Sequence, residues 1–275
     1  MKGTLYIVST PIGNLEDITL RALRILKEVD LVAAEDTRRS IKLLNHYGIS
    51  KPLISYWKEK EKTRSDELIG KLLSGQTVAL VSDAGTPGIA DPGSVLIRKA
   101  IEENISVIPV PGPSAFVAAL TVSGLPADAF IFLGFLPPGK THRRKALTDL
   151  KLEEKTLVFY EAPHRIGETL VDMEAVFGDR KAAVVKEVTK LHEEVLRGSL
   201  PEIMEQIKEK MVVGEYVIVV EGRSGVNAPS TEDALSEIRM LMKRGLGRKE
   251  SVRKVAEEYG LSKKELYDRS LNEIS

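Results

Sequence analysis

Residues 82–93 read SDAGTPGIADPG, and this stretch decides the fold. It follows the short apolar run TVALVS at 77–82 and leads into a helical pattern that begins near Ser94. Its three glycines allow tight turns and a close approach of the backbone to a ligand, while its two prolines stiffen the turns. In open α/β sheets ligands bind just beyond the carboxyl ends of the strands, so Asp83 is placed to meet one. A rigid loop that packs only on itself is the alternative interpretation.

Apolar runs of strand length alternate with amphipathic helical stretches along the chain. The predicted strands of the first half are residues 5–9, 31–34, 77–82 and 107–110. Those of the second half are residues 130–134, 156–160, 182–186 and 216–220. In the first half this alternation predicts an α/β arrangement with a mainly parallel sheet whose strands are buried on both faces. In the second half it predicts a further unit of strands with helices between them. We predict an N-terminal α/β domain at 1–120, a C-terminal α/β domain at 121–224, and a linker with a helical tail at 225–275.

The composition limits the function classes. The 275 residues hold 40 Lys and Arg and 40 Asp and Glu, so any basic surface for a polyanion must be local. Cysteine is absent, which removes disulfides and thiolate metal ligands and is typical of a reducing interior. The four histidines are scattered, and we expect no metal site. No apolar run approaches the roughly 18 residues of a membrane helix, so we expect a cytoplasmic protein without a membrane partner.

Three more strand-to-helix junctions are rich in glycine and proline. The first, STPIGNLEDIT from Ser9, lacks the spacing of a dinucleotide-binding turn and gives no support for that class. In the second, PGPSA at 111–115, free N–H groups at a helix start suit an acceptor group of a ligand. In the third, FYEAPHRI at 159–166, Arg165 stands in a first helical turn, where the helix dipole favours acids. A basic residue placed against this local preference favours a functional role.

Together these loops resemble a known family. In chain order the motifs are TPIGNLEDIT, AEDTRR, SDAGTPGIADPG, PGPSA, YEAPHRI, KEVTKLHEE and GEYVIVVEG. Their set and order are similar to S-adenosylmethionine-dependent methyltransferases of the tetrapyrrole-methylase type. More narrowly, they resemble the group that 2′-O-methylates a cytidine of bacterial small-subunit (16S) ribosomal RNA. The resemblance implies two α/β domains with S-adenosylmethionine in the cleft between them, and a homodimer.

The resemblance also implies which residues meet the cofactor and the reacting atoms. Those expected to line the S-adenosylmethionine pocket are Pro11, Ile12, Asp83, Ala84, Thr86, Ser114, Ala115, Tyr160, Ala162 and Tyr216. Methyl transfer to an oxygen is an in-line displacement that needs alignment and a group to assist loss of the proton. For that catalytic role we expect Glu187 and Lys190 of KEVTKLHEE and Asp36 of AEDTRR. The alternative for Asp36 is a helix N-cap beside a solvated face.

Two basic stretches indicate an RNA partner despite overall neutrality. Residues 140–151 hold five Lys or Arg against one acid, and the tail from Arg239 holds ten against six. Around the turn at 260–262, the tail pattern predicts a helix-turn-helix-like extension in which Ser262 caps the second helix. The predicted RNA contacts are Arg38, Arg143, Arg144, Arg165 and Lys263. The alternatives are a solvated helix face for the first stretch and a small helical cap on the second domain for the tail.

Three functions are compatible with this set of features. The first is methyl transfer from S-adenosylmethionine to the ribose 2′-hydroxyl of a cytidine in small-subunit ribosomal RNA, either free or in the assembled small ribosomal subunit. The second keeps the cofactor but methylates a tetrapyrrole or another small molecule, for which the basic stretches have no obvious use. The third is a non-enzymatic RNA-binding ribosome assembly factor, and the rigid glycine- and proline-rich loops argue against it. The sequence favours the first.

Overall fold

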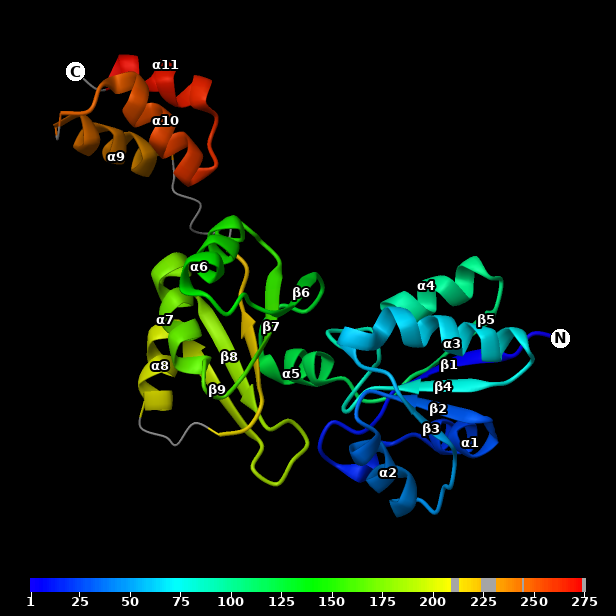
Figure 1. Cartoon of the computed structure of the whole chain (residues 1–275). Helices are drawn as coiled ribbons and strands as arrows, with labels where there is room; N and C mark the ends of the chain where they lie inside the picture. The colour runs from blue at the N-terminus through cyan, green and yellow to red at the C-terminus, as the bar shows by residue number, and fades with distance from the viewer. Residues whose placement is uncertain (209–212, 224–230, 244, 274–275) are drawn as a thin grey trace.

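The computed structural model describes residues 1–208, 213–223, 231–243 and 245–273 of the chain. It contains two α/β units, each built on a five-stranded sheet, and a C-terminal unit of three helices (Figure 1). The predicted pair of α/β units with a helical extension is confirmed. Among the described residues, no helix combines the length and the apolar character needed to cross a membrane.

The first sheet has the strand order β3-β2-β4-β1-β5, and all neighbouring strands in it are parallel. Its strands are β1 (Thr4–Val8), β2 (Leu31–Ala34), β3 (Leu53–Ser55), β4 (Val78–Val81) and β5 (Ser106–Val110). Its helices are α1 (Leu20–Glu28), α2 (Thr37–His46), α3 (Glu61–Leu73) and α4 (Ser94–Glu102), with the 3-10 helices η1 (Leu15–Asp17) and η2 (Lys58–Lys60). The sequence prediction omits β3, which has only three residues, none of them fully buried.

Both faces of this sheet are covered by helices, which explains the unbroken apolar runs of its strands. In β4, Val78 and Leu80 belong to the core that contains residues of α3 and α4. The alternate residues Ala79 and Val81 belong to the core that contains residues of α1 and α2. Because successive side chains of a strand point to opposite faces, every residue of a strand covered on both sides must be apolar.

The second sheet has the order β6-β7-β10-β8-β9 and is mixed. Its strands are β6 (Phe130–Phe135), β7 (Thr156–Glu161), β8 (Lys181–Lys186), β9 (Glu194–Ser199) and β10 (Tyr216–Val220). Only β6 and β7 are parallel, while the other three pairs are antiparallel, so the predicted parallel pairing holds for the first sheet and the second sheet differs from it. The prediction also misses β9, because the sequence EVLRGS of this edge strand is polar and half-buried. The helices of this unit are α5 (Ala115–Ser123), α6 (Lys140–Asp149), α7 (Ile166–Phe177) and α8 (Leu200–Lys208).

Helix α5 packs on the second sheet, although it directly follows the last strand of the first. Its Ala119 and Leu120 share a core with Val158 of β7 and Ala183 of β8. By packing, the change from the first unit to the second therefore falls in the loop 111–114, before α5, and not at residue 120. This loop is the PGPS segment, so the two sheets are joined at the wall of a predicted ligand site.

The C-terminal helices form a unit with its own core, drawn in orange to red in Figure 1. They are α9 (Thr231–Lys243), α10 (Arg248–Tyr259) and α11 (Lys263–Glu273). Gly260 ends α10 with a φ of +64°, and the Ser262 hydroxyl accepts the N–H of Glu265 at 3.4 Å, as the predicted turn and cap require. Most of the predicted linker, residues 224–230, lies outside the described residues.

Candidate active site

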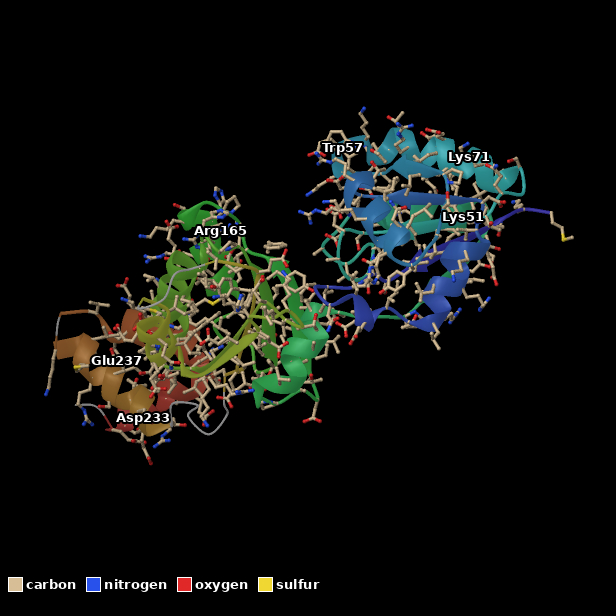
Figure 2. All side chains as sticks on the ribbon, turned by 90° about the horizontal axis from the view of Figure 1, so that it is seen from below. Lys51, Trp57, Lys71, Arg165, Asp233 and Glu237 are labelled. Atoms are coloured by element: carbon tan, nitrogen blue, oxygen red, sulfur yellow. The ribbon has the colours of Figure 1, made fainter. Side chains whose placement is uncertain are left out.

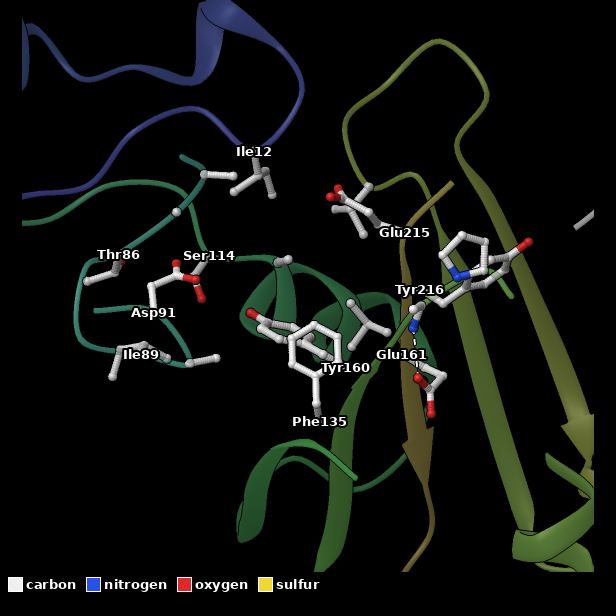
Figure 3. A pocket seen from close by; sticks show the side chains of 18 residues that line it. Ile12, Thr86, Ile89, Asp91, Ser114, Phe135, Tyr160, Glu161, Glu215 and Tyr216 are labelled. Carbon is white, nitrogen blue, oxygen red and sulfur yellow. Dashed lines mark hydrogen bonds between the residues drawn. The ribbon is translucent and has the colours of Figure 1, made fainter. Parts of the chain in front are cut away.

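A cavity of about 340 Å³ lies between the first unit and the second (Figure 3). We call it the first cavity. Its walls come from the loops after β1, β4 and β5 of the first sheet, and from the end of β7 and the start of β10 in the second. Eight of the ten residues predicted to meet the cofactor line it, namely Ile12, Ala84, Thr86, Ser114, Ala115, Tyr160, Ala162 and Tyr216. The fold therefore gathers segments that are far apart in the sequence at one site.

The loop 82–93 is fixed against the loop that follows β1. Thr10 and Gly85 exchange both of their backbone hydrogen bonds, at 2.8 and 3.0 Å. The hydroxyl oxygens of Ser9 and Thr86 lie 2.8 Å apart. Gly85 has a φ of +78°, a conformation that glycine adopts without a steric cost. These bonds preorganise one wall of the first cavity.

An aromatic wall closes the first cavity on the side of the second unit. The ring centres of Phe135 and Tyr160 lie 5.6 Å apart, and both residues line the cavity. Phe132 supports the Tyr160 ring from 4.9 Å, and Phe116 of α5 stacks on Phe132 at 4.4 Å. Burial raises the pKa of Tyr160 above its ordinary value, so the phenol stays neutral. Flat apolar faces of this kind suit a planar ring such as a purine.

Three acids that the sequence analysis did not single out, Asp91, Glu161 and Glu215, also line the first cavity. Burial first, and then repulsion from Glu35, raises the pKa of Asp91 to about 7. A cationic ligand would favour the ionised form of Asp91 and so oppose both effects. The sequence feature that could have identified Asp91 is its place as an acid inside the glycine- and proline-rich loop 82–93. In the structure, the preceding residue, Ala90, has a φ of +64°. In the described part of the chain, no group of three His, Cys, Asp or Glu is arranged to hold a metal ion.

A second cavity of about 400 Å³ adjoins the first and shares Ile12, Ala84 and Glu215 with it. The remaining two predicted cofactor residues, Pro11 and Asp83, line this second cavity. Basic side chains also line it, namely Arg39, Lys42, His46 and Lys190. The two cavities thus differ in character, because the second offers cationic groups that suit an anionic ligand.

Lys190 is held between two carboxylates at the junction of the cavities. Its Nζ donates hydrogen bonds to Oε1 of Glu187 and Oε2 of Glu215, each at 2.9 Å. Oε1 of Glu187 also accepts the backbone N–H of Glu215 at 2.9 Å. Burial opposes the charge of both Glu187 and Lys190, but these bonds outweigh it, so the pKa of Glu187 is lowered and the pKa of Lys190 is raised. Lys190 is therefore an ammonium group at neutral pH.

Two glycines make room for this group of charges. A Cβ on Gly13 would lie 2.3 Å from Cγ of Lys190, and a Cβ on Gly214 would lie 2.6 Å from the Glu187 side chain. Glu187 and Thr189 have φ values of +51° and +66°, which are uncommon for residues with a Cβ. Such backbone strain persists only where the surroundings hold it, and it clusters at functional sites.

Asp36 caps α2, as the alternative interpretation has it. Its Oδ1 accepts the N–H of Arg38 at 2.8 Å, and the Arg38 guanidinium also donates to its carboxylate. These hydrogen bonds lower the pKa of Asp36 to about 2. Its backbone N–H donates to Oδ1 of Asp83 at 3.0 Å. Asp36 is not among the described residues that line either cavity, so the structure gives its predicted catalytic role no support.

The structure corrects the prediction that Arg143 contacts RNA. The Arg143 side chain is 1% exposed, and its Nη2 lies 2.7 Å from Oδ2 of Asp172, which is equally buried. Arg144, 43% exposed, binds the other oxygen of the same carboxylate at 2.6 Å. Arg143 therefore joins α6 to α7 and is not available to a phosphate.

The other predicted RNA contacts lie in different parts of the molecule. Arg38 is 87% exposed and precedes Arg39, which lines the second cavity. Arg165 is only 16% exposed and donates to the carbonyl oxygens of Leu136 at 2.8 Å and Pro137 at 3.3 Å, so it fixes the loop after β6. Lys263 is exposed at the start of α11, in the C-terminal unit. The structure does not bring these three residues together.

Relatives of this chain match most of its sequence. Residues 4–204 match the family of tetrapyrrole (corrin/porphyrin) methylases. A protein named ribosomal RNA small subunit methyltransferase I from Halalkalibacterium halodurans is 46% identical over 272 residues, which cover 97% of this chain and 94% of that protein. A protein of the same name from Thermotoga maritima is 49% identical over 221 residues, which cover 80% of this chain and 99% of that protein.

Solved structures of lower identity share the fold of the two α/β units. A structure of diphthine synthase aligns with a TM-score of 0.63 and 18% identity, covering 81% of this chain and 91% of the other. A uroporphyrin-III-C-methyltransferase from Thermus thermophilus aligns with a TM-score of 0.58 and 21% identity, covering 80% and 94%. Because the family match spans the first sheet and most of the second, this chain belongs to the tetrapyrrole methylase family and, within it, to the ribosomal RNA small subunit methyltransferase I group.

Proposed function

We propose that this protein transfers a methyl group from S-adenosylmethionine to the ribose 2′-hydroxyl of a cytidine in small-subunit ribosomal RNA. The observation that carries the proposal is the pair of adjoining cavities, one acidic with aromatic walls and one basic, with Lys190 and Glu215 at their junction. Two ligands could lie end to end across this junction, as a direct transfer between them requires. The names of the relatives support an RNA acceptor.

The first cavity fits S-adenosylmethionine in size, shape and charge. Its volume of about 340 Å³ is within the range of small-molecule sites. Phe135 and Tyr160 offer flat faces to an adenine, and Asp91 and Glu215 offer negative charge to a ligand with an ammonium and a sulfonium. When bound, S-adenosylmethionine supplies a methyl group made electrophilic by the positive sulfur. The protein supplies the position and the exclusion of water.

The second cavity would hold the acceptor nucleotide, and the charges at the junction would assist the reaction. The Lys190 ammonium stabilises the negative charge that develops on the 2′-oxygen, and Glu215 accepts the proton of the hydroxyl. Glu187 positions both, because it binds the Lys190 ammonium and the Glu215 backbone. Assistance of this kind contributes roughly 10²–10⁴-fold to the rate, in addition to about 7–11 kcal/mol from alignment.

The C-terminal unit supplies a second RNA contact in this proposal. A groove between α10 and α11 is lined by Lys249, Val252, Lys263, Lys264, Tyr267 and Asp268. Three lysines in one groove of a helix-turn-helix-like unit suit the phosphates of a nucleic acid. The exposed Arg38 and the half-exposed Arg144 would add contacts on the two α/β units. A homodimer in the cytoplasm, expected from the resemblance, belongs to the same proposal.

The test uses purified protein and S-adenosylmethionine with a radiolabelled methyl group. Small ribosomal subunits, naked small-subunit RNA and a precorrin-type tetrapyrrole are offered in turn, and we expect label only in the RNA. Label in the macrocycle alone would establish the small-molecule alternative. If calorimetry detects no binding of S-adenosylmethionine, both enzymatic functions fail and the assembly factor remains.

The same assay tests the assignment of Lys190. Lys190→Ala should lower kcat by roughly 10²-fold or more, with the affinity for S-adenosylmethionine within about twofold of the unmodified protein, because Lys190 lines only the second cavity. The matched control is Lys27→Ala, an exposed lysine in α1. Unchanged turnover of Lys190→Ala on the RNA would remove Lys190 from the mechanism.

A further inference from the structure

Trp57 is exposed directly after β3, on the edge of the first sheet that carries the candidate active site. It is the only tryptophan of the chain, and 39% of it is exposed. Lys58 and Lys60 beside it are also exposed, and Nζ of Lys60 lies 5.8 Å from the centre of the Trp57 ring. We call Trp57, Lys58 and Lys60 the Trp57 platform. An exposed indole flanked by cations is the usual construction of a site that stacks a nucleobase and contacts its phosphate.

The backbone under the platform is anchored on both sides. Tyr56 is fully buried and its N–H donates to the carbonyl of Ala34, at the end of β2, at 2.7 Å. Its hydroxyl donates to Oε1 of Glu61 at 3.2 Å. The same Glu61 oxygen accepts the N–H of Gly93, the last residue of the loop 82–93, at 2.8 Å. The platform is therefore tied to the loop that forms the wall of the first cavity, and it presents its ring from a rigid base.

The sheet order places the platform in line with the second cavity. Strands β3, β2 and β4 are parallel neighbours, so their carboxyl ends lie side by side. The end of β3 carries Trp57, the end of β2 carries Arg38 and Arg39, and the end of β4 carries Asp83 of the second cavity. Two strand spacings separate the first from the last, which is roughly 10 Å. Arg39 links the last two ends, with its Nη1 3.4 Å from Oδ2 of Asp83.

Figure 2 shows where Trp57 lies on the first unit. Trp57 lies on the side of the first unit that faces the second, whereas Lys71 and Lys51 lie on the far side of the same unit. The exposed indole is thus turned toward the space where the acceptor would enter.

We propose that the Trp57 platform binds a nucleotide that flanks the methylated one in a single-stranded RNA segment. The RNA backbone passes from the second cavity over Arg39 and Arg38, and the base of the flanking nucleotide stacks on the Trp57 ring. Lys58 and Lys60 contact its phosphates. This inference rests on the proposed RNA acceptor and extends it, because it assigns a base-stacking subsite beyond the two cavities.

Because Trp57 is the only tryptophan, the intrinsic tryptophan fluorescence of the full chain reports on this subsite alone. The probe is a single-stranded cytidine decamer RNA, and inorganic polyphosphate serves as a polyanion without bases. We expect the decamer to quench the fluorescence with saturation and polyphosphate to leave it unquenched. Equal quenching by both, or none by the decamer at concentrations that saturate binding, would overturn the stacking.

Kinetics with small-subunit RNA provide the second measurement. Trp57→Ala should raise KM for RNA about tenfold while kcat stays within about twofold, because stacking of one base is lost and the reaction centre is intact. Trp57→Phe, which retains a ring, should recover part of the loss. The matched control is Leu73→Ala at the opposite end of α3, which is 41% exposed and should leave KM unchanged.

The two proposals fail in different ways. If the unmodified protein labels no RNA, the proposed function is wrong, whatever the fluorescence shows. If it labels RNA and Trp57→Ala has an unchanged KM and the unmodified melting temperature, only the stacking subsite is wrong. If Leu73→Ala raises KM for RNA as much as Trp57→Ala does, the effect is structural, and the assignment of the stacking subsite is also overturned.

Discussion

At the scale of single residues, the position of Lys190 in the reaction centre requires a residue without a side chain at Gly13. A Cβ there would lie 2.3 Å from Cγ of Lys190, a contact that Lys190 could relieve only by moving. We expect Gly13→Ala to lower kcat roughly 10²-fold, since a displacement of about 1 Å can have that effect. Gly70→Ala is the control, because a Cβ at Gly70 meets nothing within 4 Å and its φ is ordinary for a helix. Full activity in Gly13→Ala would show that Lys190 can shift without consequence.

The raised pKa of Asp91 predicts that stability and cofactor affinity both depend on pH. Its pKa of about 7 in the folded protein, raised first by burial, is above its ordinary value of 3.8, so the folded state binds this proton more tightly. The free energy of unfolding without cofactor should therefore fall as pH rises from about 4 to 7. A cationic cofactor favours the ionised form, so its affinity should rise about tenfold between pH 6 and 8. Calorimetry and thermal melts across this range measure both, and Asp91→Asn should flatten both curves.

Between residues and elements, the buried pair of Arg143 and Asp172 joins α6 to α7. Removing one partner of a buried pair leaves the other charge uncompensated, so Arg143→Met should lower the free energy of unfolding by about 3 kcal/mol. The affinity for RNA should not change beyond what the lost stability explains, because Arg143 is 1% exposed. The control is Lys145→Met, an exposed position in α6 where the expected change is within about 0.5 kcal/mol. Urea denaturation gives the first quantity; intact stability in Arg143→Met would contradict the buried pair.

At the scale of elements, the sequence predicts those strands, helices and loops that have a periodic apolar pattern or characteristic turn residues. The buried strands and the loop 82–93 are found because apolar runs and special turn residues are local signals. The edge strand β9 is missed because a half-buried polar strand carries neither signal. The sequence predicts no strand direction for the second sheet, because only the tertiary pairing of β10 between β7 and β8 makes it antiparallel.

The residues of the candidate site likewise divide into those that the sequence identifies and those that only the structure reveals. Motif residues such as Tyr160 are identified through the resemblance, and the structure places them at one cavity. Asp91 and Glu215 are missed because their significance lies in which charges surround them, which no local pattern records. The burial of Arg143 is missed for the converse reason, because a basic helical stretch has the same appearance whether one of its arginines is paired inside or exposed.

At the scale of the whole molecule, two sheets share one site through the loop 111–114, whereas the C-terminal unit stands apart. The core of α9–α11 is made of its own residues, and its contacts to the second unit include Lys151 with Glu258 at 3.7 Å and Arg223 with the carbonyl of Tyr259 at 3.4 Å. The Thermotoga maritima relative covers 80% of this chain with 99% of its own length, and the fifth left uncovered is about the size of this unit. The unit is thus expected to be separable from the reaction centre.

A truncation after residue 223 tests this separation. We expect the shortened protein to keep its cofactor affinity, because all the described residues that line the first cavity precede the cut. The affinity for small-subunit RNA should fall about tenfold or more, and its logarithmic salt slope should become shallower by about 1–2 because phosphate contacts are lost. In the full chain, Lys263→Gln with Lys264→Gln should reproduce part of this change, and Arg253→Gln with Lys254→Gln, outside the groove, should not. If RNA affinity and salt slope survive the truncation, the C-terminal unit serves as a helical cap, and RNA binding rests on the two α/β units alone.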